Sequence, residues 1–95
     1  MTAAGKLCIA LFLSMPHSRE RRERLTIFRS DDGGRSWPRR LVVHAGPSAY
    51  SSMLLQGGRI LLLYESGEAE GDFFADRISF ARIRLGEDSV LGLPP

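Results

Sequence analysis

Several side chains of this chain could act on, or bind, a charged ligand, among them Tyr50, Glu65 and Arg22. The phenol of a tyrosine has a pKa near ~10, so it becomes a nucleophile only where a base takes its proton. Glu65 ends an apolar run, where a carboxylate usually has a cationic partner. The guanidinium of Arg22 offers a planar fork of donors that fits a carboxylate. These residue types permit nucleophilic chemistry and anion binding.

Each of these residues also has a structural alternative. The hydroxyl of Tyr50 could simply hydrogen-bond at the end of an inner strand. Arg22 lies within a run of mixed charge, residues 19–24, and such runs usually form solvated loops. His17, in a loop, is more often a packing or solvated residue than a catalytic one, and we assign no role to His44.

A second pattern sets four residues at fixed intervals: Ser30, Asp32, Gly34 and Trp37. The Asp32 carboxylate can accept hydrogen bonds from backbone N–H groups one to three residues further on, which forms an Asx-type turn. Gly34 can adopt the positive φ of a tight reversal. Trp37 can pack its ring beneath the turn, and Ser30 can close the turn from the incoming strand. Asp-Asp-Gly-Gly alone would form a turn in many proteins, but the spaced serine and tryptophan make this pattern more specific.

This spacing resembles the Asp box of sialidase-type β-propellers, which forms the turn between the third and fourth strands of a blade. Two later stretches, Gly-Pro-Ser-Ala-Tyr-Ser-Ser at 46–52 and Leu-Leu-Leu-Tyr-Glu at 61–65, are similar to the C-terminal end of exo-α-sialidases. The lysosomal type is the most similar, and like its members this chain has Ser52 where the commoner pattern is Tyr-Ser-Asp. The resemblance extends from about residue 5 to residue 85.

The resemblance implies a role for each candidate residue. Sialidases cleave a sugar whose anomeric carbon bears a carboxylate, and they use a tyrosine nucleophile where most glycosidases use a carboxylate. Tyr50 matches that nucleophile, and Arg22 matches one of three arginines that bind the substrate carboxylate. Glu65 matches the glutamate that orients another arginine of that triad. Arg21 remains a rival to Arg22, because Arg24 stands where many sialidases have Asn or Asp.

The implied activity is hydrolysis of terminal sialic acids from glycoconjugates, as in lysosomal ganglioside and oligosaccharide catabolism, without metal or cofactor. The family's aspartate acid/base, the glutamate that activates the tyrosine, and two triad arginines have no counterpart here. We therefore expect this polypeptide to be inactive by itself, with the remainder of the propeller missing from it. The alternative is a non-catalytic Asp-box module that binds glycans or acts as a scaffold.

Composition allows one small domain of 95 residues, of which 43% are hydrophobic and 25% charged. A net charge of +2 is too small to predict a nucleic-acid partner. Cys8, with only His17 and His44 to help, cannot form a zinc site. The apolar run 6–13 is a strand or, less favoured, a short signal peptide, and it falls short of the ~20 residues of a membrane span.

The alternation of apolar residues predicts an all-β chain with a tight hairpin at Gly57-Gly58 and a linker at 46–48. Residues 60–64 are apolar on both faces, which predicts cover from both sides. With the resemblance, this pattern indicates the C-terminal one and a half to two blades of a six-bladed β-propeller. The propeller part spans residues 1–85, with the Asp box at 30–37, and residues 86–95 form a flexible tail. The expected strands are 6–13, 24–29, 39–44, 50–55, 60–65 and 78–84.

Overall fold

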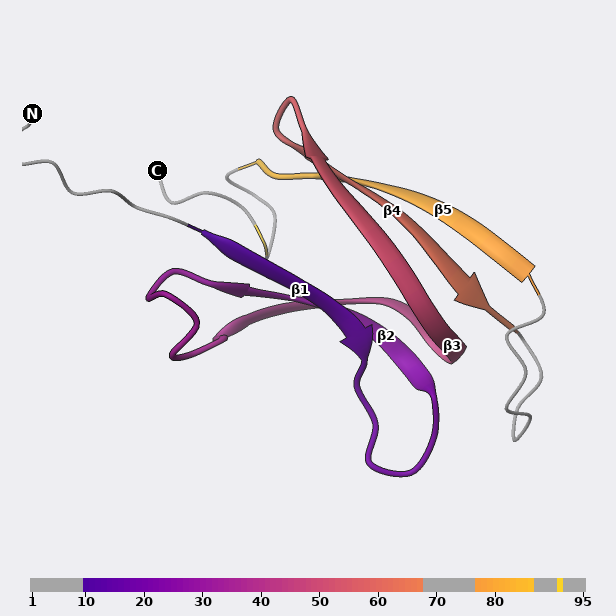
Figure 1. Ribbon diagram of the computed structural model, residues 1–95. Coiled ribbons are helices and arrows are strands. Elements are labelled where there is room, and N and C mark those ends of the chain that lie inside the picture. Colours follow the sequence, from indigo (N-terminus) through magenta and orange to yellow (C-terminus); the bar gives the residue numbers. More distant parts are fainter. Residues whose placement is uncertain (1–9, 68–76, 87–90, 92–95) are drawn as a thin grey trace, which may run out of the picture.

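The computed structural model describes residues 10–67, 77–86 and 91. Its five strands follow one another in a single antiparallel sheet, so that each strand pairs with its neighbours in sequence (Figure 1). The all-β prediction is confirmed for this part of the chain. No helix long and apolar enough to cross a membrane occurs in the described ranges. The strands are β1 (Leu11–Pro16), β2 (Glu23–Ser30), β3 (Arg39–Gln56), β4 (Arg59–Ser66) and β5 (Arg77–Arg84).

Strand β3 runs for 18 residues and belongs to both halves of the sheet. Its first half pairs with β2 and its second half with β4, and Figure 1 shows it turning sharply between them. The prediction of two strands with a linker at 46–48 is therefore wrong. The backbone stays in the strand because both sides are hydrogen-bonded: Pro47 O accepts from Gly67 N–H at 2.9 Å, and Ser48 N–H donates to Arg22 O at 2.8 Å.

Strand β1 begins and ends later than the predicted strand 6–13. It reaches Pro16, which pairs with Leu25 of β2, whereas residues 6–9 lie outside the described part. A proline is tolerated at this position because β1 is an edge strand, where its missing N–H removes no hydrogen bond between central strands.

The core lies where the bent sheet brings β2 and β4 together. Leu25 and Ile27 from β2 form one fully buried cluster with Ile60 and Leu62 from β4. Leu91 completes this cluster and is 0% exposed, although the sequence placed it in a flexible tail. The neighbouring stretches 87–90 and 92–95 lie outside the described residues.

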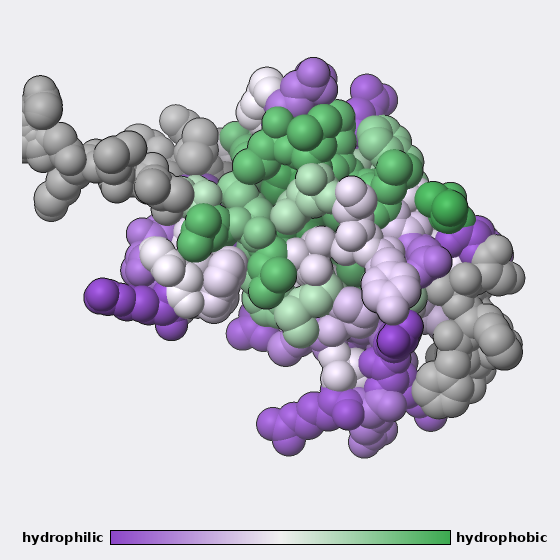
Figure 2. Space-filling model, viewed as in Figure 1, coloured by the Kyte–Doolittle hydropathy of each residue, from purple (hydrophilic) through white to green (hydrophobic). Residues whose placement is uncertain are grey.

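The second half of the sheet is buried on one face only. On its other face Leu54, Leu63, Ile78 and Phe80 are 58%, 50%, 75% and 56% exposed. The expectation that both faces of 60–64 are covered is thus not met by this chain alone. Figure 2 shows hydrophobic side chains gathered over the middle of the visible face, with hydrophilic ones at its margins.

Candidate functional site

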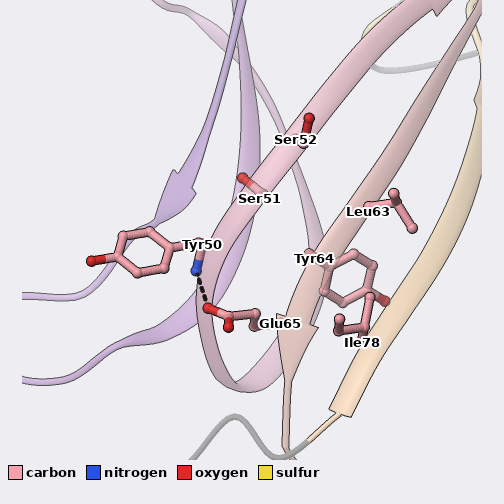
Figure 3. A pocket seen from close by; sticks show the side chains of 7 residues that line it. All are labelled: Tyr50, Ser51, Ser52, Leu63, Tyr64, Glu65 and Ile78. Atoms are coloured by element: carbon pink, nitrogen blue, oxygen red, sulfur yellow. Dashed lines mark hydrogen bonds between the residues drawn. The ribbon is translucent and has the colours of Figure 1, made fainter.

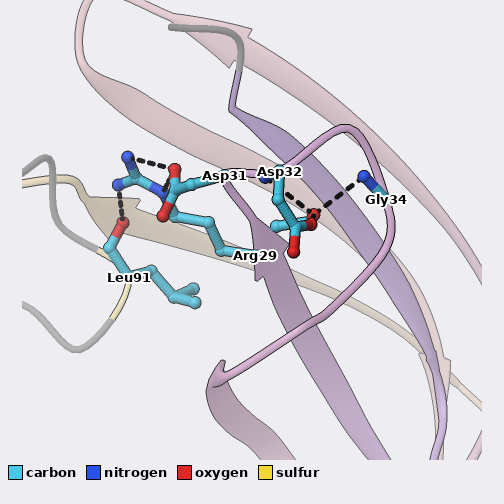
Figure 4. A network of polar contacts seen from close by, with 6 residues as sticks. Arg29, Asp31, Asp32, Gly34 and Leu91 are labelled. Carbon is cyan, nitrogen blue, oxygen red and sulfur yellow. Dashed lines mark hydrogen bonds and ion pairs between the residues drawn. The ribbon is translucent and has the colours of Figure 1, made fainter.

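The turn after β2 has side-chain hydrogen bonds of the predicted Asx type. The Ser30 hydroxyl donates to Asp32 Oδ1 at 2.8 Å and accepts from Gly34 N–H at 2.9 Å (Figure 4). Asp32 Oδ1 also accepts from Ser36 N–H at 2.9 Å, and Oδ2 accepts from the Ser36 hydroxyl at 2.5 Å. The carboxylate thus reaches four residues along the chain, one further than predicted. These hydrogen bonds, first among them those from Ser36, hold the pKa of Asp32 well below its usual range.

The remaining two residues of the motif behave as predicted. Gly34 has a φ of +91°, and Gly33 before it has +77°, which are conformations that favour glycine. A Cβ added at Gly34 would lie 3.7 Å from Trp37 Cζ2 and 3.7 Å from Leu11 Cδ1. The half-buried Trp37 ring therefore packs directly against the turn. This turn is a structural unit, because its polar groups are bonded to one another.

A buried arginine that the sequence did not single out joins the turn to the core. Arg29 is 2% exposed, and its Nε donates to Asp31 Oδ1 at 2.9 Å, within an ion pair with the same carboxylate (Figure 4). One terminal nitrogen of Arg29 donates to Leu91 O at 3.0 Å. Its guanidinium also lies 5.7 Å from the centre of the Phe12 ring. An Arg in a strand next to Asp-Asp was the only signal in the sequence that could have indicated this contact.

Tyr50 lies in a β-bulge of β3. Ser48 pairs with Ser66 and Ser51 pairs with Tyr64, so β3 takes three steps where β4 takes two. A bulge of this kind leaves a residue outside the regular pairing and re-aims its side chain. Tyr50 is 73% exposed, and its ring points away from β4 (Figure 3). The bulge therefore presents the phenol outward.

Glu65 lies beside this bulge. Its Oε1 accepts a hydrogen bond from the backbone N–H of Tyr50 at 3.0 Å (Figure 3). The bulge would otherwise leave that N–H without a partner in the sheet, so Glu65 stabilises the conformation that aims Tyr50. The described residues provide no arginine partner for Glu65, and its predicted role toward another arginine stays a prediction.

Arg22 lies next to Tyr50 and belongs to the loop before β2. Its guanidinium carbon lies 5.4 Å from the centre of the Tyr50 ring, a cation–π arrangement. Its carbonyl oxygen accepts from Ser48 N–H, which ties the loop to β3 at the start of the bulge. The structure thus brings together Arg22, Tyr50 and Glu65, which sequence reasoning had chosen from three separate stretches.

The start of β2, directly after this loop, contains an unusual backbone conformation. Arg24 has a φ of +60°, the left-handed region that non-glycine residues adopt at a cost. Its carbonyl oxygen holds the conformation in place by accepting from the Thr26 hydroxyl at 2.7 Å and from His17 N–H at 3.0 Å. Asn and Asp tolerate this region better than Arg does.

The Tyr50 side of the sheet also carries a recess of about 300 Å³. Near it, the Ser51 hydroxyl lies 2.7 Å from that of Ser14, and the buried Ser48 hydroxyl has no partner among the described residues. The recess is at the lower end of the ~300–1,000 Å³ range of ligand pockets. It is lined by Tyr50, Ser51, Ser52, Leu63, Tyr64, Glu65 and Ile78 (Figure 3).

Neither histidine takes part in this site. The His17 ring packs edge-on against Phe28, with ring centres 5.1 Å apart. His44 Nε2 lies 2.8 Å from the carbonyl oxygen of Gly67, and its ring is 6.1 Å from that of Tyr64. No group of three or more His, Cys, Asp or Glu side chains that could hold a metal occurs within residues 10–67, 77–86 and 91.

Comparison with known proteins identifies no relative: no family model, no curated protein and no solved structure matches the chain.

Proposed function

We propose that the chain forms the C-terminal part of an exo-α-sialidase that removes terminal sialic acids from glycoconjugates through a tyrosine nucleophile. The observation that carries this proposal is the convergence of Arg22, Tyr50 and Glu65. An outward phenol with a guanidinium over its ring suits a substrate that carries a carboxylate beside the carbon to be attacked. The role of Arg22 is to bind that carboxylate, and Tyr50 attacks the anomeric carbon.

The exposed surfaces support the view that other blades complete the site. Tyr50 is largely exposed, and so is the apolar face formed by Leu54, Leu63, Ile78 and Phe80. A face of this kind is covered by the next sheet in a stacked all-β architecture. On this proposal the missing blades supply the acid/base, the base for Tyr50 and two further arginines. The chain by itself is then inactive, and lysosomal placement belongs to the same proposal.

One observation favours a second candidate, a non-catalytic Asp-box module that binds glycans or serves as a scaffold. The turn at Ser30–Trp37 is satisfied by its own hydrogen bonds and is a stable structural unit without any catalytic residue. A scaffold, however, needs neither the outward Tyr50 nor the Glu65 that holds its bulge. We therefore favour the enzyme.

The sequence encoded upstream of Met1 separates the two candidates. The sialidase proposal expects an in-frame extension with a Phe-Arg-Ile-Pro segment and further Asp boxes, and a parent protein that hydrolyses a fluorogenic sialoside. A parent protein without that segment that binds sialosides but does not hydrolyse them would instead support the non-catalytic module.

A further inference from the structure

Three arginines gather at the end of the sheet away from Tyr50. Arg59 begins β4 and pairs directly with Arg84 at the end of β5, while Arg82 lies two residues before Arg84 on the same face. They line a recess of about 260 Å³. All three side chains are exposed.

The backbone beneath this cluster is well defined. Gly57 and Gly58 have φ values of +57° and +75°, as in the two-residue hairpin turn that the sequence predicted. Leu85 N–H donates to Gly58 O at 2.9 Å and fastens the end of β5 to that turn. Strands β4 and β5 lie side by side (Figure 1). Their register and the hairpin hold Arg59 opposite Arg84.

The charge of this cluster is not balanced by the described residues. Like charges directly opposite each other destabilise a sheet, yet Arg59 and Arg84 occupy such a pair. Within residues 10–67, 77–86 and 91, no carboxylate forms an ion pair with Arg59, Arg82 or Arg84. The acidic residue on the same face of β4 is Glu65, which pairs with Ile78 about 20 Å along the strands. An anion between the two guanidinium groups would relieve this repulsion.

We propose that this recess binds a phosphoryl group. Three guanidinium groups carry a charge of three, which suits a phosphoryl dianion better than a monocarboxylate. Directly opposed residues have Cβ atoms about 5 Å apart and diagonal ones about 7–8 Å apart, so three guanidinium forks can reach different oxygens of one tetrahedral group. The recess is smaller than most pockets for whole ligands and therefore takes one anionic group.

The surface beside the recess is apolar, which indicates a ligand with an apolar substituent next to its phosphoryl group. Arg82 pairs across the strands with Leu61, and Phe80, two residues before it, is more than half exposed. A smaller recess of about 180 Å³ between β3, β4 and β5 adjoins these residues and is lined mainly by apolar side chains. A phosphomonoester with an apolar substituent can therefore place its phosphoryl group on the arginines and its substituent on Leu61 and Phe80. This proposal uses none of the catalytic residues of the proposed sialidase site. It does need Phe80, which that proposal places beneath a neighbouring blade, to be accessible, so the chain of 95 residues by itself is the right protein for its test.

Titration calorimetry of the full chain, fused to a soluble carrier, tests this site with phenyl phosphate, inorganic phosphate and acetate. We expect saturable binding of phenyl phosphate with a dissociation constant of about 1 mM or tighter. Arg59→Gln and Arg84→Gln should each weaken it about tenfold or more. Arg40→Gln, an exposed arginine in the other half of the sheet, should leave it unchanged. Acetate should bind much more weakly, since it carries a single charge.

Two further measurements control for loss of folding and for the charge of the ligand. Removing one of two opposed arginines should raise the melting temperature without ligand, because it removes a repulsion. Binding of phenyl phosphate should weaken between pH 7.5 and pH 5, since its second pKa is near ~6 while arginine stays charged. If phenyl phosphate binds more tightly than inorganic phosphate, the ligand of this site is a phosphomonoester. If inorganic phosphate binds more tightly, the ligand is free phosphate. Absence of saturable phosphate binding, or equal binding by Arg59→Gln and Arg84→Gln, would overturn the proposal.

Discussion

Arg22 and Tyr50 are 28 residues apart in the sequence, yet the guanidinium carbon of Arg22 lies 5.4 Å from the centre of the Tyr50 ring. Two irregularities of the backbone produce this arrangement. The bulge between Ser48 and Ser51 turns the phenol outward, and the positive φ of Arg24 lies at the irregular start of β2, two residues after Arg22. The hydrogen bond from Ser48 N–H to Arg22 O joins the start of the bulge to the loop that carries Arg22. The candidate site is thus formed where the regular sheet is interrupted.

The first prediction separates Arg22 from its neighbour. In the sialidase of which we propose this chain to be a part, Arg22→Lys should raise KM for a sialoside by about tenfold or more, because lysine cannot form the bidentate contact with a carboxylate. Arg21→Lys should change KM little. Steady-state kinetics of the two variants measures this difference. If Arg21→Lys has the larger effect, carboxylate binding belongs to Arg21.

The second prediction concerns the strained backbone at Arg24. Arg24→Gly should raise the free energy of unfolding by about 1 kcal/mol, because glycine adopts a φ of +60° without the cost that a Cβ imposes. Arg24→Asn should give a smaller gain. Urea unfolding of the chain on a tryptophan-free carrier, followed by the fluorescence of Trp37, its single tryptophan, measures both. The matched control is Arg40→Gly in β3, which should destabilise by roughly 0.5–1 kcal/mol. A loss of stability in Arg24→Gly would contradict the account of this loop.

The third prediction follows from the pKa of Asp32, which its hydrogen bonds lower below the usual ~4. Because the folded-state pKa is the lower one, the stabilisation is complete above the unfolded-state pKa and is lost as pH falls toward the folded-state value. Lowering the pH from 6 to 3 should therefore reduce the urea midpoint of the wild type more than that of Asp32→Asn. Glu20→Gln, an exposed acid in the loop before β2, should behave like the wild type. If the urea midpoint of Asp32→Asn falls as much as that of the wild type, other carboxylates determine the loss of stability in acid.

The fourth prediction tests the burial of Leu91. Leu91→Ala should lower the free energy of unfolding by about 2–4 kcal/mol, since the side chain is fully buried against Leu25 and Ile60. Leu55→Ala, at a position that is half exposed, should cost less than about 1 kcal/mol. The same urea unfolding assay compares the two variants. If Leu91→Ala has no effect, the C-terminal stretch does not contribute to the core.

Local patterns predicted much of this fold. Alternating apolar residues located β2, β4 and β5 to within two residues, and Gly57-Gly58 marked the hairpin correctly. The continuity of β3 could not be predicted, because Gly46-Pro47 is typical of an interruption, whereas pairing with Glu23 and Ser66 and hydrogen bonds with Arg22 and Gly67 keep the stretch in the sheet. Leu91 and Arg29 were missed for a related reason: their contact spans 62 residues, and an arginine at the end of the predicted strand 24–29 does not by itself indicate burial.

The candidate site was likewise predicted in part from the sequence. The Asp-box residues were chosen from their spacing, and their hydrogen bonds follow from neighbouring side chains in one short turn. Tyr50, Glu65 and Arg22 were chosen by resemblance, and periodicity gave no sign of the bulge that brings them together. The bulge depends on a mismatch between two strands, which a single stretch of sequence does not encode visibly. The recess between Arg59, Arg82 and Arg84 likewise required the register of β4 with β5.

The central claim is that Tyr50 is a sialidase nucleophile, and a mechanism-based fluorosialyl probe tests it most directly. In the parent enzyme the probe should form an adduct on Tyr50, located by peptide mass spectrometry, and Tyr50→Phe should remove it. Turnover should fall by several orders of magnitude in Tyr50→Phe, whereas stability should change by only about 1 kcal/mol, because one exposed hydroxyl is lost. The chain of 95 residues alone should give no adduct. An adduct on another residue of the parent enzyme, or full turnover by Tyr50→Phe, would contradict the assignment.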